Sequence, residues 1–208
     1  MAIYFAIALI AYLLGSVPFG LILVRVVRGE DVRLSGSGNI GATNVARSGG
    51  AKLGVLTLLL DALKGFAAVE FARAMSGRHS GIDSGLAAAI AALCAILGHV
   101  FPVWLKFRGG KGVATAVGAF AGLAPRAILV VLAIFLLVVL LFRYISLGSI
   151  VASAAFPILA YFLYSGSCSA AGLVVMFLAS LLIIVKHKAN IRRLLNGTEN
   201  RFQFHKAH

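Results

Sequence analysis

The chain has 208 residues, of which 61% are hydrophobic and 12% are charged, and its 19 Lys and Arg against 6 Asp and Glu give a net charge of +13. An ordinary soluble domain has an apolar share nearer half, so this composition excludes that class. The basic residues are divided among short segments and form no basic domain, which argues against nucleic-acid binding. The apolar runs have roughly the 17–25 residues that cross a bilayer. We therefore expect an all-α polytopic membrane protein.

Seven transmembrane helices are predicted. The first lacks the basic start of a signal peptide, so we expect it to be retained. The fourth is shorter than a full bilayer crossing, and Pro125 marks the turn into the fifth. Because no connection is long enough for a second domain, residues 1–208 are expected to form one integral-membrane domain. In chain order the spans are about 2–26, 53–73, 85–105, 112–124, 126–142, 147–165 and 169–187.

The distribution of charge predicts an orientation. Seven spans place the termini on opposite sides of the membrane. With the N-terminus outside, 15 of the 19 Lys and Arg fall on the cytoplasmic side, while Arg73, Arg78 and Arg126 lie outside and Lys64 lies within a span. This asymmetry agrees with the positive-inside rule. It puts the C-terminus and every glycine-rich basic segment on the cytoplasmic face.

A polar segment, GSGNIGATNVAR, follows the first span and runs from Gly36 to Arg47. Its glycines let backbone N–H groups approach a ligand, and the guanidinium fork of Arg47 suits phosphate. The G-x-G-x-x-G spacing does not indicate a Rossmann site, because no βαβ unit is predicted here. A flexible polar loop is the alternative interpretation. We favour one wall of an anion site, in which Ser37 and Arg47 act and the following residues hold substrate: Gly36, Gly38, Asn39, Gly41, Thr43 and Asn44.

A second segment, RGGKGVAT, joins the third and fourth spans. A lysine among glycines at the start of a helix combines a positive charge, free backbone N–H groups and the helix dipole, which together favour an oxyanion. A basic turn that obeys the positive-inside rule is the alternative. It accounts for the lysine but not for the glycines or the threonine. The predicted anion-binding residues are Gly109, Gly110, Lys111, Gly112 and Thr115.

The third segment begins at the end of the last span. His187, Asn190 and Arg193 recur every three residues and would share one face of a helix. A basic interfacial helix on anionic lipid is the alternative, to which His and Asn would add little. Ser146 and Ser149 stand at the start of the sixth span, where one of them is expected to cap the helix.

Other polar residues carry weaker signals. Asp61 and Lys64 lie at i, i+3 in the second span, where charges are often functional but can also neutralise each other to fix packing. His99 is interpreted as a packing histidine. His79 and Asp83 fall one residue short of the H-x4-D acyltransferase pattern and lie on the predicted outer face, so we discount them. No cluster has metal-ligand spacing, no cofactor is expected, and no nucleophile elbow is present.

Together these segments resemble the PlsY family, the bacterial integral-membrane acyl-phosphate:glycerol-3-phosphate acyltransferases. The resemblance covers nearly the whole chain except Arg201–His208, which carry no motif. Its specificity comes from the order and spacing of six pieces. They are AYLLGS-x-PFG, GSGNIGATNVAR, LLDALKG, GHVFPVW-x-x-F-x-GGKGVAT, R-Y-x-S-L-x-S and H-x-x-NI-x-RLL-x-G-x-E.

The resemblance implies seven transmembrane helices in the bacterial inner membrane, with the site facing the cytoplasm. It also implies acyl transfer from a fatty acyl phosphate to the 1-hydroxyl of glycerol 3-phosphate, giving lysophosphatidate and phosphate in phospholipid synthesis. An enzyme that forms acyl phosphate is then the implied partner. A transporter of phosphorylated metabolites is the alternative, although no inverted repeat is visible. The catalytic residues implied by the family are Ser37, Arg47, Lys111, Ser149, His187 and Asn190.

Overall fold

The computed structural model describes residues 1–163 and 169–202, and every regular element within these ranges is helical. Two of the elements, η1 and η2, are single 3-10 turns. The elements are α1 (Ala2–Ser16), α2 (Phe19–Arg28), η1 (Val32–Leu34), α3 (Ala42–Gly49), α4 (Ala51–Ser76), α5 (Ser84–Val100), η2 (Val103–Leu105), α6 (Val113–Leu123), α7 (Pro125–Phe142), α8 (Ile145–Leu163), α9 (Ala170–Lys186) and α10 (Lys188–Leu195).

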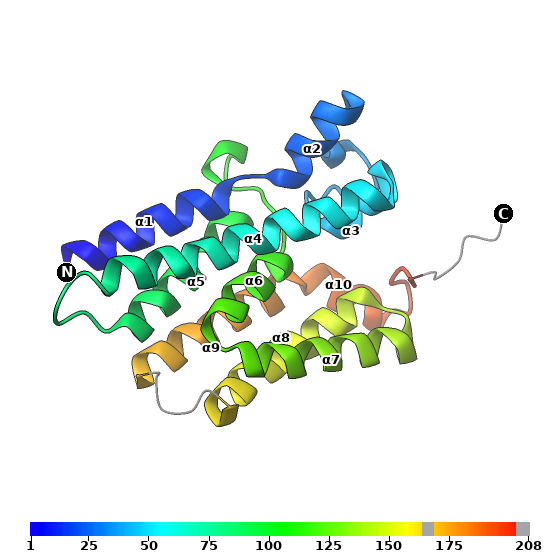
Figure 1. The fold of residues 1–208 in the computed structure, drawn as a ribbon. Coiled ribbons are helices and arrows are strands. Elements are labelled where there is room, and N and C mark those ends of the chain that lie inside the picture. The colour runs from blue at the N-terminus through cyan, green and yellow to red at the C-terminus, as the bar shows by residue number, and fades with distance from the viewer. Residues whose placement is uncertain (164–168, 203–208) are drawn as a thin grey trace.

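The long helices lie side by side as a bundle (Figure 1). The closest pairs are α1 with α5, α4 with α6, and α7 with α8, and α9 packs against both α5 and α8. The N-terminus and the α4–α5 turn lie at one end of the bundle, whereas α2, α3 and the α7–α8 turn lie at the other. Gly65 of α4 and Gly118 of α6 each contact a backbone carbonyl of the facing helix. Small residues of this kind let membrane helices approach closely.

Several helices have the length and apolarity of membrane spans. Within the described ranges, Ala2–Arg28, Ser84–Leu105, α7 and α8 meet this description, and α9 with α10 adds a fifth if this pair, bent by 54°, is counted as one span. On α7, much of the large apolar surface is exposed, including Leu136, Leu137, Leu140 and Leu141. An apolar face of this kind suits contact with lipid. The prediction of an all-α membrane protein with several spans is confirmed.

Three of the predicted spans, the first, the sixth and the last, have ends or breaks that the helices now define. The first is broken between α1 and α2, where Val17 is extended and Pro18 has no N–H to donate. The last predicted span ends at His187, where α10 turns away by 54°. The sixth begins at Ile145, and its predicted end at 164–165 lies outside the described residues.

Candidate active site

The 36–47 segment is folded around the side chain of Asn44. Its Oδ1 accepts the Ser37 N–H at 2.8 Å, and its Nδ2 donates to the carbonyls of Val32, Ser35 and Asn39 at 2.8–3.1 Å. Asn44 is 2% exposed, so these bonds occupy a buried side chain. Gly36 has φ 59°, and a Cβ there would overlap Asn44 Oδ1. Asn44 therefore shapes the loop from within.

The outer residues of this segment remain open. The second half of the predicted loop is helical, because α3 begins at Ala42 and carries Thr43 and Arg47. Ser37, Gly38, Thr43 and Arg47 are exposed, whereas Gly41 is half-buried and donates its N–H to Asn39 Oδ1 at 2.8 Å. Arg47 forms no ion pair with any residue of the described ranges. Its guanidinium is available to an anion.

The glycines of the second segment bind to the end of α5. Gly109 N–H donates to Val100 O at 3.1 Å and Gly110 N–H to His99 O at 3.0 Å. The prediction that these two N–H groups are free is therefore wrong, because the turn folds back on the last residues of α5. The N-terminus of α6 does stay open: Gly112 is its N-cap and provides no side-chain cap. A helix start of this kind favours an anion.

Thr115 lies elsewhere than predicted. It is fully buried, its carbonyl contacts Gly65 of α4, and its hydroxyl has no hydrogen-bond partner among the described residues. A side chain enclosed between helices does not reach a substrate. We therefore assign Thr115 to the packing of α6 on α4.

The second and third segments meet in one hydrogen-bond network. Lys111 Nζ donates to Asn190 Oδ1 at 2.6 Å, and Asn190 Nδ2 donates to Glu199 Oε1 at 2.7 Å. The same oxygen accepts the Ser146 hydroxyl at 2.8 Å, while Arg193 Nε donates to Glu199 Oε2 at 2.6 Å. Three regions far apart in the sequence thus converge: the α5–α6 turn, the start of α8, and α10 with the segment after it.

This network carries more positive than negative charge. Burial, with a smaller contribution from the positive charges of Arg193 and Arg47, lowers the pKa of the Lys111 ammonium to about 8, while the negative charge of Glu199 opposes this lowering. Burial would raise the pKa of the Glu199 carboxyl, but the hydrogen bonds from Asn190, Ser146 and Arg193 outweigh it and lower that pKa. At neutral pH the network therefore holds one carboxylate, Glu199, and two cations, Lys111 and Arg193. The positive charge of Arg47, on α3, also acts on the Lys111 ammonium.

His187 occupies the break between α9 and α10 and is 2% exposed. Its Nδ1 lies 2.8 Å from Ile183 O. Because a carbonyl oxygen only accepts, Nδ1 carries the proton, and in the neutral ring Nε2 is left as an acceptor. The predicted helix that follows is confirmed as α10.

Neither of the two serines near the start of α8 forms the expected helix cap, because α8 begins at Ile145 and includes both. Ser149 is 3% exposed and donates to Ile145 O at 2.9 Å, within its own helix. Ser146 is the one that contacts Glu199. Sequence reasoning missed Ser146 and Glu199 as site residues, although both stand in the quoted motifs.

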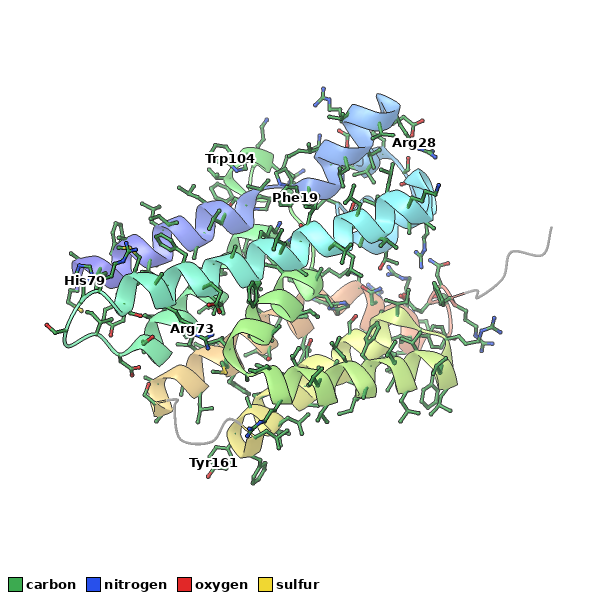
Figure 2. All side chains as sticks on the ribbon, viewed as in Figure 1. Phe19, Arg28, Arg73, His79, Trp104 and Tyr161 are labelled. Carbon is green, nitrogen blue, oxygen red and sulfur yellow. The ribbon has the colours of Figure 1, made fainter. Side chains whose placement is uncertain are left out.

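His79 and Asp83 lie apart from this site, as Figure 2 shows by placing His79 at the opposite end of the bundle from Arg28. Asp83 caps α5 by accepting the Leu86 N–H at 2.9 Å. His79 Nδ1 contacts Met75 O at 2.9 Å. These contacts give both residues a structural role.

Comparison with known proteins identifies the family. A family model described as glycerol-3-phosphate acyltransferase matches residues 5–197. The chain belongs to this acyltransferase family. A glycerol-3-phosphate acyltransferase of Syntrophotalea carbinolica is 50% identical over 203 residues, which cover 98% of this chain and all of the relative. One from Rhizobium meliloti is 52% identical over 190 residues, covering 91% and 88%. The resemblance found in the sequence is confirmed.

Solved structures of the family share the fold. The crystal structure of PlsY, an integral membrane glycerol 3-phosphate acyltransferase, in its glycerol 3-phosphate form has a TM-score of 0.86 and 40% identity, over 96% of each chain. Its lysophosphatidic acid form has a TM-score of 0.82 and 38% identity, over 96% of this chain and 95% of that one. The chain is therefore an integral membrane acyltransferase by family and by fold.

Proposed function

We propose that this protein transfers a fatty acyl group from acyl phosphate to the 1-hydroxyl of glycerol 3-phosphate, releasing lysophosphatidate and inorganic phosphate. One observation carries the proposal. Lys111 and Arg193 converge on a cluster that contains a single carboxylate, Glu199, with Arg47 close enough to act on Lys111. A surplus of positive charge suits substrates that each carry a phosphate. The glycerol 3-phosphate form of the related PlsY supports the choice of acceptor.

Two features could each hold a phosphate. One is the exposed wall formed by Ser37 and Arg47, where a guanidinium can bind phosphate through two parallel hydrogen bonds. The other is the uncapped start of α6 beside the ammonium of Lys111. Two anion-binding features match a reaction that brings two phosphate groups together.

The chemistry needs little beyond positioning and charge. Acyl phosphate is already activated, so the hydroxyl oxygen attacks the acyl carbon directly and the bond from that carbon to the phosphate oxygen breaks. Lys111 and Arg47 stabilise the charge that develops on the leaving phosphate. His187 Nε2 and Asn190 orient the glycerol hydroxyl, whose proton passes to a substrate phosphate oxygen. This route forms no covalent acyl-enzyme.

We place the active site at the cytoplasmic face of the bacterial inner membrane. For the chain to cross the membrane seven times, α4 and α6 must also be membrane spans. The charged residues of α4 argue against a span, but Asp61 and Lys64 form a buried pair 2.8 Å apart and need not face lipid. The shorter helix α6 packs along α4. The basic residues near α2, α3 and α10 favour the cytoplasmic side.

Residues 1–208 act as one domain. The acyl chain of the donor enters the site from the bilayer, and a separate enzyme supplies the acyl phosphate.

The test is an assay of the purified protein in detergent with palmitoyl phosphate and glycerol 3-phosphate. We expect lysophosphatidate to form, and palmitoyl-CoA to fail as the donor. If lysophosphatidate forms only with palmitoyl-CoA, the proposed donor is wrong. The alternative, a transporter, predicts that proteoliposomes take up labelled glycerol 3-phosphate while no lysophosphatidate forms.

A further inference from the structure

A buried ionic cluster lies beside the active site and has no part in the proposed reaction. Asp61 and Lys64 of α4 and His99 of α5 are 1%, 5% and 3% exposed. Lys64 Nζ lies 2.8 Å from Asp61 Oδ1 and donates to Val17 O at 2.7 Å, at the break between α1 and α2. His99 Nδ1 lies 3.5 Å from the same Asp61 oxygen. Buried charges are costly to desolvate, and such a cluster is weak evidence for stability alone.

The other side of the His99 ring faces the active-site turn. Its Nε2 lies so close to Gly110 that a Cβ on this glycine would overlap the ring. The backbone of His99 and of Val100 accepts the N–H groups of Gly110 and Gly109. The next residue, Lys111, reaches Asn190 at 2.6 Å. A continuous series of contacts thus connects the α1–α2 break, α4, α5 and the amine of Lys111.

We infer that Asp61, Lys64 and His99 are positioning residues, which hold the imidazole against Gly110 and so fix the turn that presents Lys111 to the substrate. This inference rests on the proposed function of Lys111. The turn contains three glycines and would otherwise be conformationally loose. The Asp61 carboxylate lies 3.5 Å from Nδ1 on one side of the imidazole, and Gly110 packs against Nε2 on the other. Displacing a catalytic charge by about 1 Å can reduce a rate about a hundredfold.

Hydrogen exchange tests the positioning role without requiring activity. His99→Ala should increase the exchange of the amides in residues 106–115, because Gly110 loses the ring that packs against it. Thr57→Val is the matched control: Thr57 is fully buried on α4 and donates only to Leu53 O of its own helix, at 2.8 Å. The control should leave this segment unchanged. Equal exchange in His99→Ala and wild type would overturn the inference.

A double-mutant cycle tests whether the contact acts on catalysis. Gly110→Ala should lower kcat/KM for glycerol 3-phosphate because the new methyl group overlaps the His99 ring, and His99→Ala should lower it by releasing the turn. The double variant has room for the methyl group, so we expect it to be roughly tenfold more active than the product of the two single effects predicts. Losses that simply multiply would overturn the inference, since independent packing defects combine in that way.

The two measurements separate this inference from the proposed function. If wild-type protein makes no lysophosphatidate but His99→Ala loosens residues 106–115, the proposed function fails and the positioning of the turn stands. If wild type is active, and neither the exchange nor the cycle shows coupling, the positioning role fails and the proposed function stands.

Discussion

The charge of Glu199 gives the sharpest prediction on pH dependence. A lysine binds phosphate as an ammonium, so activity should fall as the pH rises through the pKa of Lys111, which is about 8. Glu199 opposes the lowering of that pKa. Glu199→Gln removes this negative charge, keeps the shape of the side chain and keeps an oxygen to accept from Ser146 and Asn190. The pKa of Lys111 should then move below 8.

The size of the shift follows from the geometry. The Lys111 ammonium and the Glu199 carboxylate both contact the Asn190 side chain, at 2.6 and 2.7 Å. For unit charges separated by roughly 6 Å, Coulomb's law gives about 0.7 kcal/mol in water and about 2.8 kcal/mol at an effective dielectric constant of 20. At 1.36 kcal/mol per unit, the alkaline limb should move down by about 0.5 to 2 pH units.

The assay is kcat/KM for glycerol 3-phosphate between pH 6 and pH 10, because this parameter reports groups of the free enzyme. Lys111→Arg is the control, since a guanidinium stays charged throughout this range and should remove the limb from whatever activity remains. The reasoning is refuted if the limb of folded Glu199→Gln stays in place or moves to higher pH.

Three further predictions concern single residues. Lys111→Ala should lower kcat by about a hundredfold or more, because a pre-organised charge is lost; a near-normal rate in well-folded protein would remove its assigned role. Arg47→Lys should raise the KM of one phosphate substrate about tenfold, since an ammonium cannot form the paired bonds of a guanidinium, and an unchanged KM for both substrates would contradict this. Asn44→Ala should destabilise the protein by about 2–4 kcal/mol by leaving loop carbonyls unpaired, as measured by thermal unfolding in detergent; the loss should exceed that of Thr57→Val.

The sequence predicted the helical membrane class and the family, whereas the contacts between side chains were learned from the structure. Charge asymmetry and motif order were enough to group Lys111 with Asn190, because both follow from where polar segments interrupt apolar runs. Residue spacing did not distinguish Ser146 from Ser149, since the choice depends on which face of α8 meets the segment after α10. Glu199 was not predicted as a site residue, because the three groups that donate to it, on Ser146, Asn190 and Arg193, are brought together only by the fold.

The hydrogen bonds of the backbone could not be predicted from the sequence either. Glycines beside Lys111 suggested free N–H groups, yet Gly109 and Gly110 donate theirs to the end of α5. Their small size serves the contact with His99 and Pro102 instead. Likewise, the first span was predicted as continuous, but the chain breaks between α1 and α2, where Val17 O accepts a hydrogen bond from Lys64 of α4. Contacts between segments that are far apart in the sequence cannot be predicted from the pattern of neighbouring residues.

The central claim is that Lys111 and its network carry acyl transfer between two phosphate-bearing substrates. Its most direct test measures phosphate and lysophosphatidate together in one reaction of purified protein with palmitoyl phosphate and glycerol 3-phosphate. We predict equal amounts of the two products with wild type, and almost none of either with folded Lys111→Ala. Phosphate release without lysophosphatidate, or full activity in Lys111→Ala, would contradict it.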